Sequence, residues 1–159
     1  MVIKTVCDRD IRDVVTSLLA YQRDAPIHIR MVSPRICDAI LSDGDKLSEK
    51  INDLITYKNA LVTLVVKKKG IKDDKEDEIL QTLQDMGVKI HFRKNLHVKT
   101  ILLTTNKEKG VLITSSNLTP TGLGSQREMG VYFLNEMDHI HERVDRYLTK
   151  LLGEESPIR

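Results

Sequence analysis

The order in which apolar segments follow one another is the feature of this sequence that most restricts its fold. As far as residue 87, runs suited to buried strands, such as 27–32 and 60–66, alternate with segments whose apolar residues recur at helical spacing. Beyond residue 87, four strand-like runs come in succession with no helical pattern between them. These runs are residues 88–92, 98–105, 111–114 and 128–134. This order predicts the α/β class, with a mixed, largely parallel β-sheet flanked by helices on both faces.

Helical patterns account for much of the remaining chain. Asp8 is placed as the N-cap of the first helix. Residues 36–55 trace helical segments around a polar break at 42–45. Residues 73–86 form an amphipathic pattern with acidic residues in its first turn, and Gly87 is a typical C-cap. A further helix is expected to close the chain.

Length and composition favour one domain. The chain has 159 residues, of which 40% are hydrophobic, enough for a single core. We expect a domain over residues 1–152 and a flexible tail at 153–159. No stretch approaches the ~20 consecutive apolar residues that a membrane span needs, so we expect a cytoplasmic protein without a membrane partner.

The charge is unevenly distributed. The formal net charge is only +2, but residues 67–109 contain 11 Lys and Arg against 7 Asp and Glu. This excess favours a polyanionic partner. Cys7 and Cys37 show no CxxC spacing and lie in no Cys/His cluster, so neither a zinc site nor a disulfide framework is expected. We therefore predict no metal and no cofactor.

Five polar residues make a candidate phosphate site. His97 and Lys99 are two apart at the head of an apolar run, as are Ser115 and Asn117 after the next run, and Glu128 begins a third. Residues two apart on a strand share a face. Lys99 and Asn117 could bind phosphate oxygens, His97 could attack phosphorus or transfer protons, and Glu128 could orient the imidazole. A functionless alternative treats Ser115 and Asn117 as turn residues.

The pattern resembles that of the phospholipase D superfamily. The matching segments are H-V-K at 97–99, T-S-S-N-L-T at 114–119 and R-E-M-G at 127–130. The resemblance extends over roughly residues 79 to 134, and the order of elements before it is compatible with the same fold. H-x-K alone is a weak signal, whereas all three segments in order on strands are far more specific.

The resemblance implies metal-independent phosphodiester cleavage through a phosphohistidine intermediate, a reaction that needs two histidines. The chain has one H-x-K segment, so a complete site implies a homodimer in which two subunits share it. The family pattern also continues as H-x-K-x4-D, and the position of that aspartate is occupied by Thr104. The absence of this aspartate favours an activity below that of members that have it.

Short members of the family with one motif include nucleases, so nucleic acid, DNA or RNA, is the expected substrate, ahead of phospholipid. Basic residues of the middle segment are candidate nucleic-acid contacts, although a lysine run most often forms a solvated loop. These residues are Lys67, Lys68, Lys69, Arg93 and Lys94. The alternative function is a weakly active or inactive domain that serves as a DNA-binding or dimerisation module. Such a domain could belong to a larger helicase or restriction protein.

Overall fold

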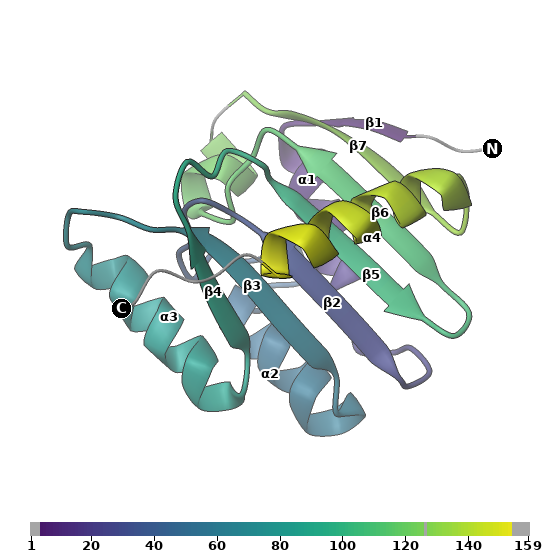
Figure 1. The fold of residues 1–159 in the computed structure, drawn as a ribbon, viewed down its shortest axis with the longest axis horizontal. Coiled ribbons are helices and arrows are strands. Elements are labelled where there is room, and N and C mark those ends of the chain that lie inside the picture. The colour runs from purple at the N-terminus through teal and green to yellow at the C-terminus, as the bar shows by residue number, and fades with distance from the viewer. Residues whose placement is uncertain (1–3, 126, 154–159) are drawn as a thin grey trace.

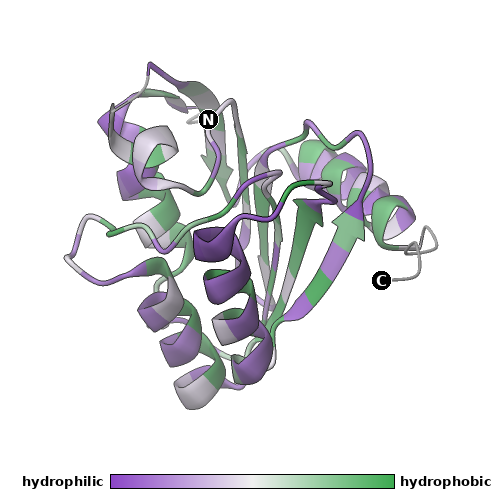
Figure 2. Ribbon diagram, turned by 90° about the vertical axis from the view of Figure 1, so that its left-hand side faces the viewer, coloured by the Kyte–Doolittle hydropathy of each residue, from purple (hydrophilic) through white to green (hydrophobic). Residues whose placement is uncertain are grey.

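Residues 4–125 and 127–153 are described by a computed structural model of the chain. Its strands are β1 (Lys4–Cys7), β2 (Ile27–Val32), β3 (Leu61–Lys67), β4 (Lys89–Arg93), β5 (Thr100–Thr105), β6 (Lys109–Thr114) and β7 (Met129–Leu134). Its helices are α1 (Arg9–Leu18), α2 (Leu47–Lys58), α3 (Asp74–Met86) and α4 (Asp138–Gly153), with a π-helical turn η1 (Thr121–Ser125). The sheet lies between α4 on one face and the other three helices on the opposite face (Figure 1, Figure 2). The expected α/β class, with a mixed sheet covered on both faces, is confirmed.

The seven strands form one sheet in the order β1-β7-β6-β5-β2-β3-β4. Parallel pairs join β2 to β3 and β3 to β4, whereas the other neighbours among the described strands are antiparallel. The expectation of a largely parallel sheet is therefore wrong. Parallel neighbours need a crossover of about a dozen residues or more, which α2 and α3 provide. The connection from β5 to β6, residues 106–108, is long enough only for a tight antiparallel turn.

Local sequence explains α3 better than it explains the segment before α2. The Asp73 carboxylate accepts a hydrogen bond from the Glu76 N–H at 3.2 Å at the start of α3, and Gly87 ends the helix at φ 102°. Residues 36–46, expected to be helical, are irregular. The polar break at 42–45 leaves only residues 36–41 before it, which are too few to sustain a helix, and Ile36 pairs instead with Leu118.

Two further expectations concern the boundary of the C-terminal tail and membrane-spanning helices. Gly153, placed in the tail by the sequence, is the last residue of α4, and residues 154–159 lie outside the described part. Within residues 4–125 and 127–153, no helix is both long enough and apolar enough to span a bilayer.

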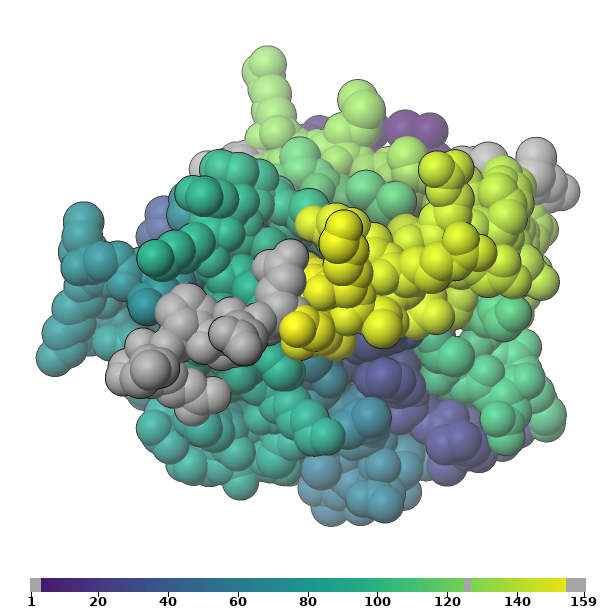
Figure 3. Space-filling view, viewed as in Figure 1, coloured from purple at the N-terminus to yellow at the C-terminus, as the bar shows by residue number. Residues whose placement is uncertain are grey.

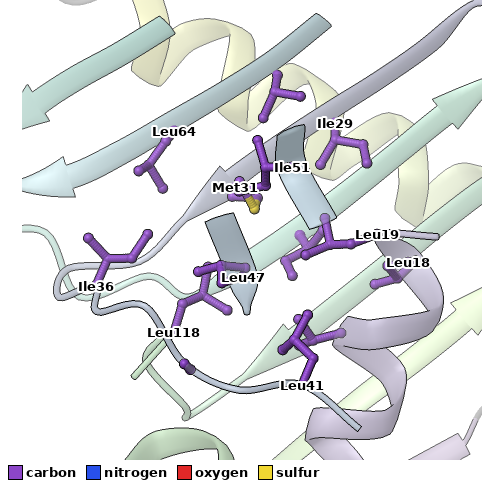
Figure 4. Packing of buried hydrophobic residues seen from close by; sticks show 14 of the residues in the cluster. Leu18, Leu19, Ile29, Met31, Ile36, Leu41, Leu47, Ile51, Leu64 and Leu118 are labelled. Carbon is purple, nitrogen blue, oxygen red and sulfur yellow. The ribbon is translucent and has the colours of Figure 1, made fainter. Parts of the chain in front are cut away.

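Two apolar layers hold the sheet between its helices. The larger packs the sheet against α1, α2 and α3, and Figure 4 shows part of it, where Ile36, Leu47 and Leu118 lie close to Met31 of β2. The smaller layer packs the opposite face against Leu148 and Leu151 of α4. Leu118 is 4% exposed, so its burial anchors the segment that carries two of the predicted site residues.

Polar contacts also fasten α4 to the sheet. Arg30 of β2 pairs with Asp145, and Thr104 of β5 lies 3.2 Å from the ring nitrogen Nε2 of His141. The same nitrogen lies 3.2 Å from the Leu103 carbonyl oxygen. Thr104, the residue at the family aspartate position, thus lies towards the end of β5 and contacts α4.

Candidate active site at the strand ends

All five residues of the predicted phosphate site lie at one edge of the sheet. At this edge, upper left in Figure 1, β2, β3, β4 and β6 end while β5 and β7 begin. His97 and Lys99 lie in the segment that leads into β5, Ser115 and Asn117 follow β6, and Glu128 precedes β7. Because β5, β6 and β7 are neighbours in the sheet, these three segments lie side by side.

Ser115 and Glu128 are in direct contact. The Ser115 hydroxyl donates to the Glu128 carboxylate and accepts from the Met129 N–H at 3.1 Å. The Ser115 N–H donates in turn to the Met129 carbonyl oxygen at 2.9 Å. The hydroxyl is therefore held with its proton directed at a carboxylate, at the point where β6 and β7 separate.

Asn117 is fixed by its side-chain oxygen. Asn117 Oδ1 accepts a hydrogen bond from the Arg35 backbone N–H at 3.2 Å. This contact leaves the amide NH₂ group to donate to a ligand, as binding of a phosphate oxygen requires. The next residue, Leu118, donates its N–H to the buried Ser33 hydroxyl at 2.9 Å and accepts at its carbonyl from Cys37 N at 2.9 Å. The asparagine thus stands on a well-anchored backbone.

His97 and Lys99 lie in a segment whose backbone is held; the His97 side chain is exposed and the Lys99 side chain is half-buried. Leu96 is 4% exposed, and the Lys99 carbonyl accepts from Thr114 N at 3.1 Å, which ties the segment to the end of β6. Lys99 Nζ donates to the His97 carbonyl oxygen at 3.2 Å. The His97 imidazole is exposed and has no hydrogen bond to any residue between 4 and 125 or 127 and 153. It is accessible to a substrate.

One expected contact is not made within a single chain. The Glu128 carboxylate bonds to Ser115, and no hydrogen bond joins it to His97 in the part of the chain that the structure describes. The orienting role expected for Glu128 therefore stays a prediction.

The expected nucleic-acid contacts separate into three groups. Lys68 and Lys94 are exposed, and Lys67 is half-buried at the end of β3. Lys69 is paired with Glu76, so its charge is locally neutralised. Arg93 is 3% exposed, and its guanidinium donates to the carbonyls of Leu151 at 2.9 Å and Leu152 at 3.2 Å near the end of α4. The expectation that Arg93 contacts nucleic acid is wrong, because its buried guanidinium binds backbone carbonyls near the end of α4.

Asp8 belongs to this edge, although the sequence placed it at a helix start. Its side chain makes no capping bond to α1. Asp8 Oδ1 accepts from the Glu128 N–H at 3.1 Å, and Asp8 N donates to the Glu128 carbonyl at 2.9 Å. The residue adopts φ 50° and ψ −119°, outside the left-handed α region in which aspartate at positive φ is usually found. No pattern in the sequence could have paired residues 120 positions apart.

The thiol of Cys37 lies near this edge and lines a hollow together with Asn117. Burial raises the pKa of the Cys37 thiol, and the nearby charge of Asp73 adds to the effect, so the thiol stays protonated at neutral pH. Across residues 4–125 and 127–153, no group of three or more His, Cys, Asp and Glu side chains is placed to hold a metal ion.

Chemically, one subunit offers an accessible imidazole, a lysine ammonium, an amide donor and a serine–glutamate pair at a single sheet edge. Cationic and amide donors stabilise charge on phosphate oxygens, and a neutral imidazole is a nucleophile for phosphorus. The fold and this cluster define the class of α/β phosphodiesterase-like domains with an H-x-K segment.

Comparison with known proteins agrees with this class. The family model described as cardiolipin synthase, PLD-like domain, matches residues 12–152. Nuc from Salmonella typhimurium, a phospholipase D family member, covers 99% of both chains with a TM-score of 0.73 and 15% identity. NucT from Helicobacter pylori covers 99% of this chain and 100% of its own, with a TM-score of 0.68 and 13% identity.

The archaeal chromatin protein TrmBL2 matches 98% of this chain over 54% of its own, with a TM-score of 0.59 and 10% identity. No curated protein sequence matches. At these identities the structural matches show a shared fold, while the family model spans most of the chain. The chain therefore belongs to the phospholipase D superfamily.

Proposed function

We propose that this protein is a metal-independent phosphodiesterase, most specifically a nuclease, that acts through a phosphohistidine intermediate at a site shared by two subunits. The observation that carries the proposal is the cluster at the sheet edge, where an exposed His97 and a half-buried Lys99 lie at the same strand ends as Asn117 and the bonded pair of Ser115 and Glu128. The nuclease assignment draws on Nuc and NucT, which have the same fold over the same length.

The reaction proceeds in two displacements. In the first, a nitrogen lone pair of neutral His97 attacks phosphorus, the bond to the leaving oxygen breaks, and protonated His97 of the partner subunit gives its proton to that oxygen. In the second, water attacks phosphorus, passes a proton to the partner's now neutral imidazole, and the phosphorus–nitrogen bond breaks. Lys99 and Asn117 hold the non-bridging oxygens throughout, and no metal is required.

Thr104, at the position of the family aspartate, lies outside the cluster of its own subunit. Thr104 lies near the far end of β5, where it pairs with Lys109 and contacts His141 of α4. His97 and Lys99 precede the opposite end of the same strand. The substitution therefore removes no group from the cluster of its own subunit.

An exposed apolar strip beside the site supports a dimer. We define it as Ile113, Met129 and Val131, which share the α4 face of the sheet but are not covered by that helix along their whole length. Ile113 is 42% exposed and Met129 62% exposed. Ile113 pairs directly with Val131 across β6 and β7. An apolar surface next to an incomplete site is suited to burial against a second copy.

The decisive test uses bis(p-nitrophenyl) phosphate and single- and double-stranded oligonucleotides in EDTA. Wild-type protein should cleave without metal, and His97→Ala or Lys99→Ala should lower kcat at least ~10³-fold while the melting temperature is kept. His139→Ala, which removes an exposed histidine of α4, is the matched control and should leave the rate unchanged. Full activity in purified His97→Ala protein would refute the assignment.

Subunit mixing tests the sharing of the site. If each site needs two histidines, an equal mixture of wild type and His97→Ala, allowed to exchange subunits, retains about a quarter of the activity of undiluted wild type. Independent subunits would retain about half, and that outcome would exclude a shared site.

A second candidate function is a DNA-binding module without catalysis. TrmBL2, an archaeal chromatin protein with a novel mode of DNA binding, has the same fold. Absence of cleavage at any enzyme concentration, together with tight DNA binding, would favour this module over the enzyme.

A further inference from the structure

Arg35 stands between the predicted phosphate site and a second basic surface. It follows β2 at the same sheet edge, and its backbone N–H holds Asn117 Oδ1 at 3.2 Å. Its side chain is 63% exposed, and the nearest carboxylate oxygen, on Asp73, is 3.7 Å from Nη2. An ion pair at that distance and exposure is weak, so the guanidinium is free to bind another anion.

The hollows around Arg35 adjoin one another. Arg35 and Asn117 line one hollow of about 660 Å³, next to the start of η1. Arg35 also lines a second hollow, of about 770 Å³, whose other walls are residues 67–75. A surface path therefore leads from Asn117 past Arg35 to this segment.

Residues 67–72, K-K-K-G-I-K, form what we call the basic loop. It connects β3 to α3 and projects at the left of the molecule in Figure 3. Lys68 and Lys72 are exposed, and the partner of Lys72 is Asp74 at 3.5 Å, with both side chains more than 80% exposed. Lys69 is occupied by Glu76. The loop therefore offers its outer lysines to an anion.

The basic loop also covers an apolar floor. Together with Leu80 and Phe92 it lines a third hollow, of about 400 Å³, whose acidic residues are Asp73, Asp77 and Glu76, the last of them paired with Lys69. Ile71 is 85% exposed at its mouth. Lysines around an apolar floor suit a ligand that joins an anionic group to a flat apolar one, as a nucleotide does.

We propose that Arg35 and the basic loop bind the phosphates that neighbour the scissile one, and that the ligand is a single-stranded nucleic acid with one unpaired base held over Phe92 and Leu80. The inference rests on the proposed phosphate site at Asn117 and names its substrate class. A single strand is favoured over a duplex because the base must be unpaired to reach the floor. Inorganic polyphosphate has no apolar group, and an acyl chain carries no succession of charges to match Arg35, Lys68 and Lys72.

The test measures binding, so that it is independent of cleavage. Fluorescein-labelled decathymidylate is titrated at several salt concentrations in EDTA into the full chain carrying His97→Ala. Adding Lys68→Gln with Lys72→Gln should weaken binding at least tenfold and reduce the slope of log K against log salt by about 1.4, because each phosphate contact on a single strand contributes about 0.7. Adding Arg35→Gln should reduce the slope by about 0.7.

The control pair Lys89→Gln and Lys150→Gln removes the same charge from exposed lysines at the start of β4 and in α4. Equal slopes for this pair and the loop pair would overturn the proposal. Ile71→Ser should weaken binding of decathymidylate but not of inorganic polyphosphate. Equally tight binding of polyphosphate, or binding only to vesicles of phosphatidylglycerol, would also overturn it. A chain that shows the expected slopes yet cleaves no diester would leave this inference standing and remove the proposed catalysis.

Discussion

Gly122, in the turn η1, lies against the backbone of Asn117. A Cβ built at residue 122 would lie 3.1 Å from both the Asn117 nitrogen and Thr119 Oγ1, and closer still to the Asn117 carbonyl oxygen. Real Cβ atoms essentially never approach other atoms within 3.0 Å. Gly122→Ala must therefore move the Asn117 carbonyl oxygen and the turn apart by about 0.7 Å, from 2.3 Å to the 3.0 Å limit. A misplacement of about 1 Å in a catalytic group costs on the order of 10²-fold in rate, and overpacking of this kind costs about 1–3 kcal/mol of stability.

The assay is kcat/KM for bis(p-nitrophenyl) phosphate, with the melting temperature measured in parallel. Gly124→Ala is the matched control, since a Cβ at residue 124, two residues further along the same turn, meets nothing within 4 Å. We expect Gly122→Ala to fold with a lower melting temperature and to lose about 10²-fold in kcat/KM, whereas Gly124→Ala keeps both values. If the two variants were equally active, the position of Asn117 would not matter for the reaction, and the assignment of this residue to the phosphate site would fall.

Three further predictions concern pH, the fastening of α4 and the dimer. Burial lowers the pKa of both His28 and His141 below the ordinary 6.5. As pH falls below 6.5, these two histidines therefore become protonated in the unfolded chain before they do so in the folded protein. Stability present above pH 6.5 should therefore be lost as pH falls through the lowered pKa values, and the urea midpoint should decline less steeply in His141→Gln. Arg93→Gln should cost about 2–4 kcal/mol by urea denaturation, because charged hydrogen bonds to buried carbonyls are lost; an unchanged midpoint would contradict this role. Met129→Asp should give a monomer by solution mass and abolish cleavage, whereas Leu61→Asp, on β3 away from the site, should do neither; a fully active Met129→Asp monomer would rule out the shared site.

The sequence predicted those features that depend on nearby residues. The caps of α3 are an example, because Asp73 and Gly87 act within one turn of the helix that they end. The strand-end cluster was also predictable, since H-x-K and S-x-N each combine a local spacing with a position at the end of an apolar run. Their meeting at one edge then follows from neighbouring strands.

Features that depend on distant parts of the chain could not be predicted. Aspartate is a residue type typical of helix N-caps, and Asp8 precedes a helix. Only the pairing of β1 with β7 reveals that it binds Glu128. Arg93 looks like a surface cation until α4 covers it. The parallel share of the sheet was overestimated for a similar reason, because the first half of the chain carries the crossover helices and the second half does not.

The contact between Asp8 and Glu128 is expected to form late in folding. It links residues 120 positions apart, and closing such a long loop is a slow, entropically costly event in folding. The hairpins formed by β5, β6 and β7 have much shorter loops to close, so they are able to assemble before β1 joins them. A partly folded molecule would then already contain the hydrogen-bonded side chains of Ser115 and Glu128, while the Glu128 backbone still lacks its two contacts with Asp8.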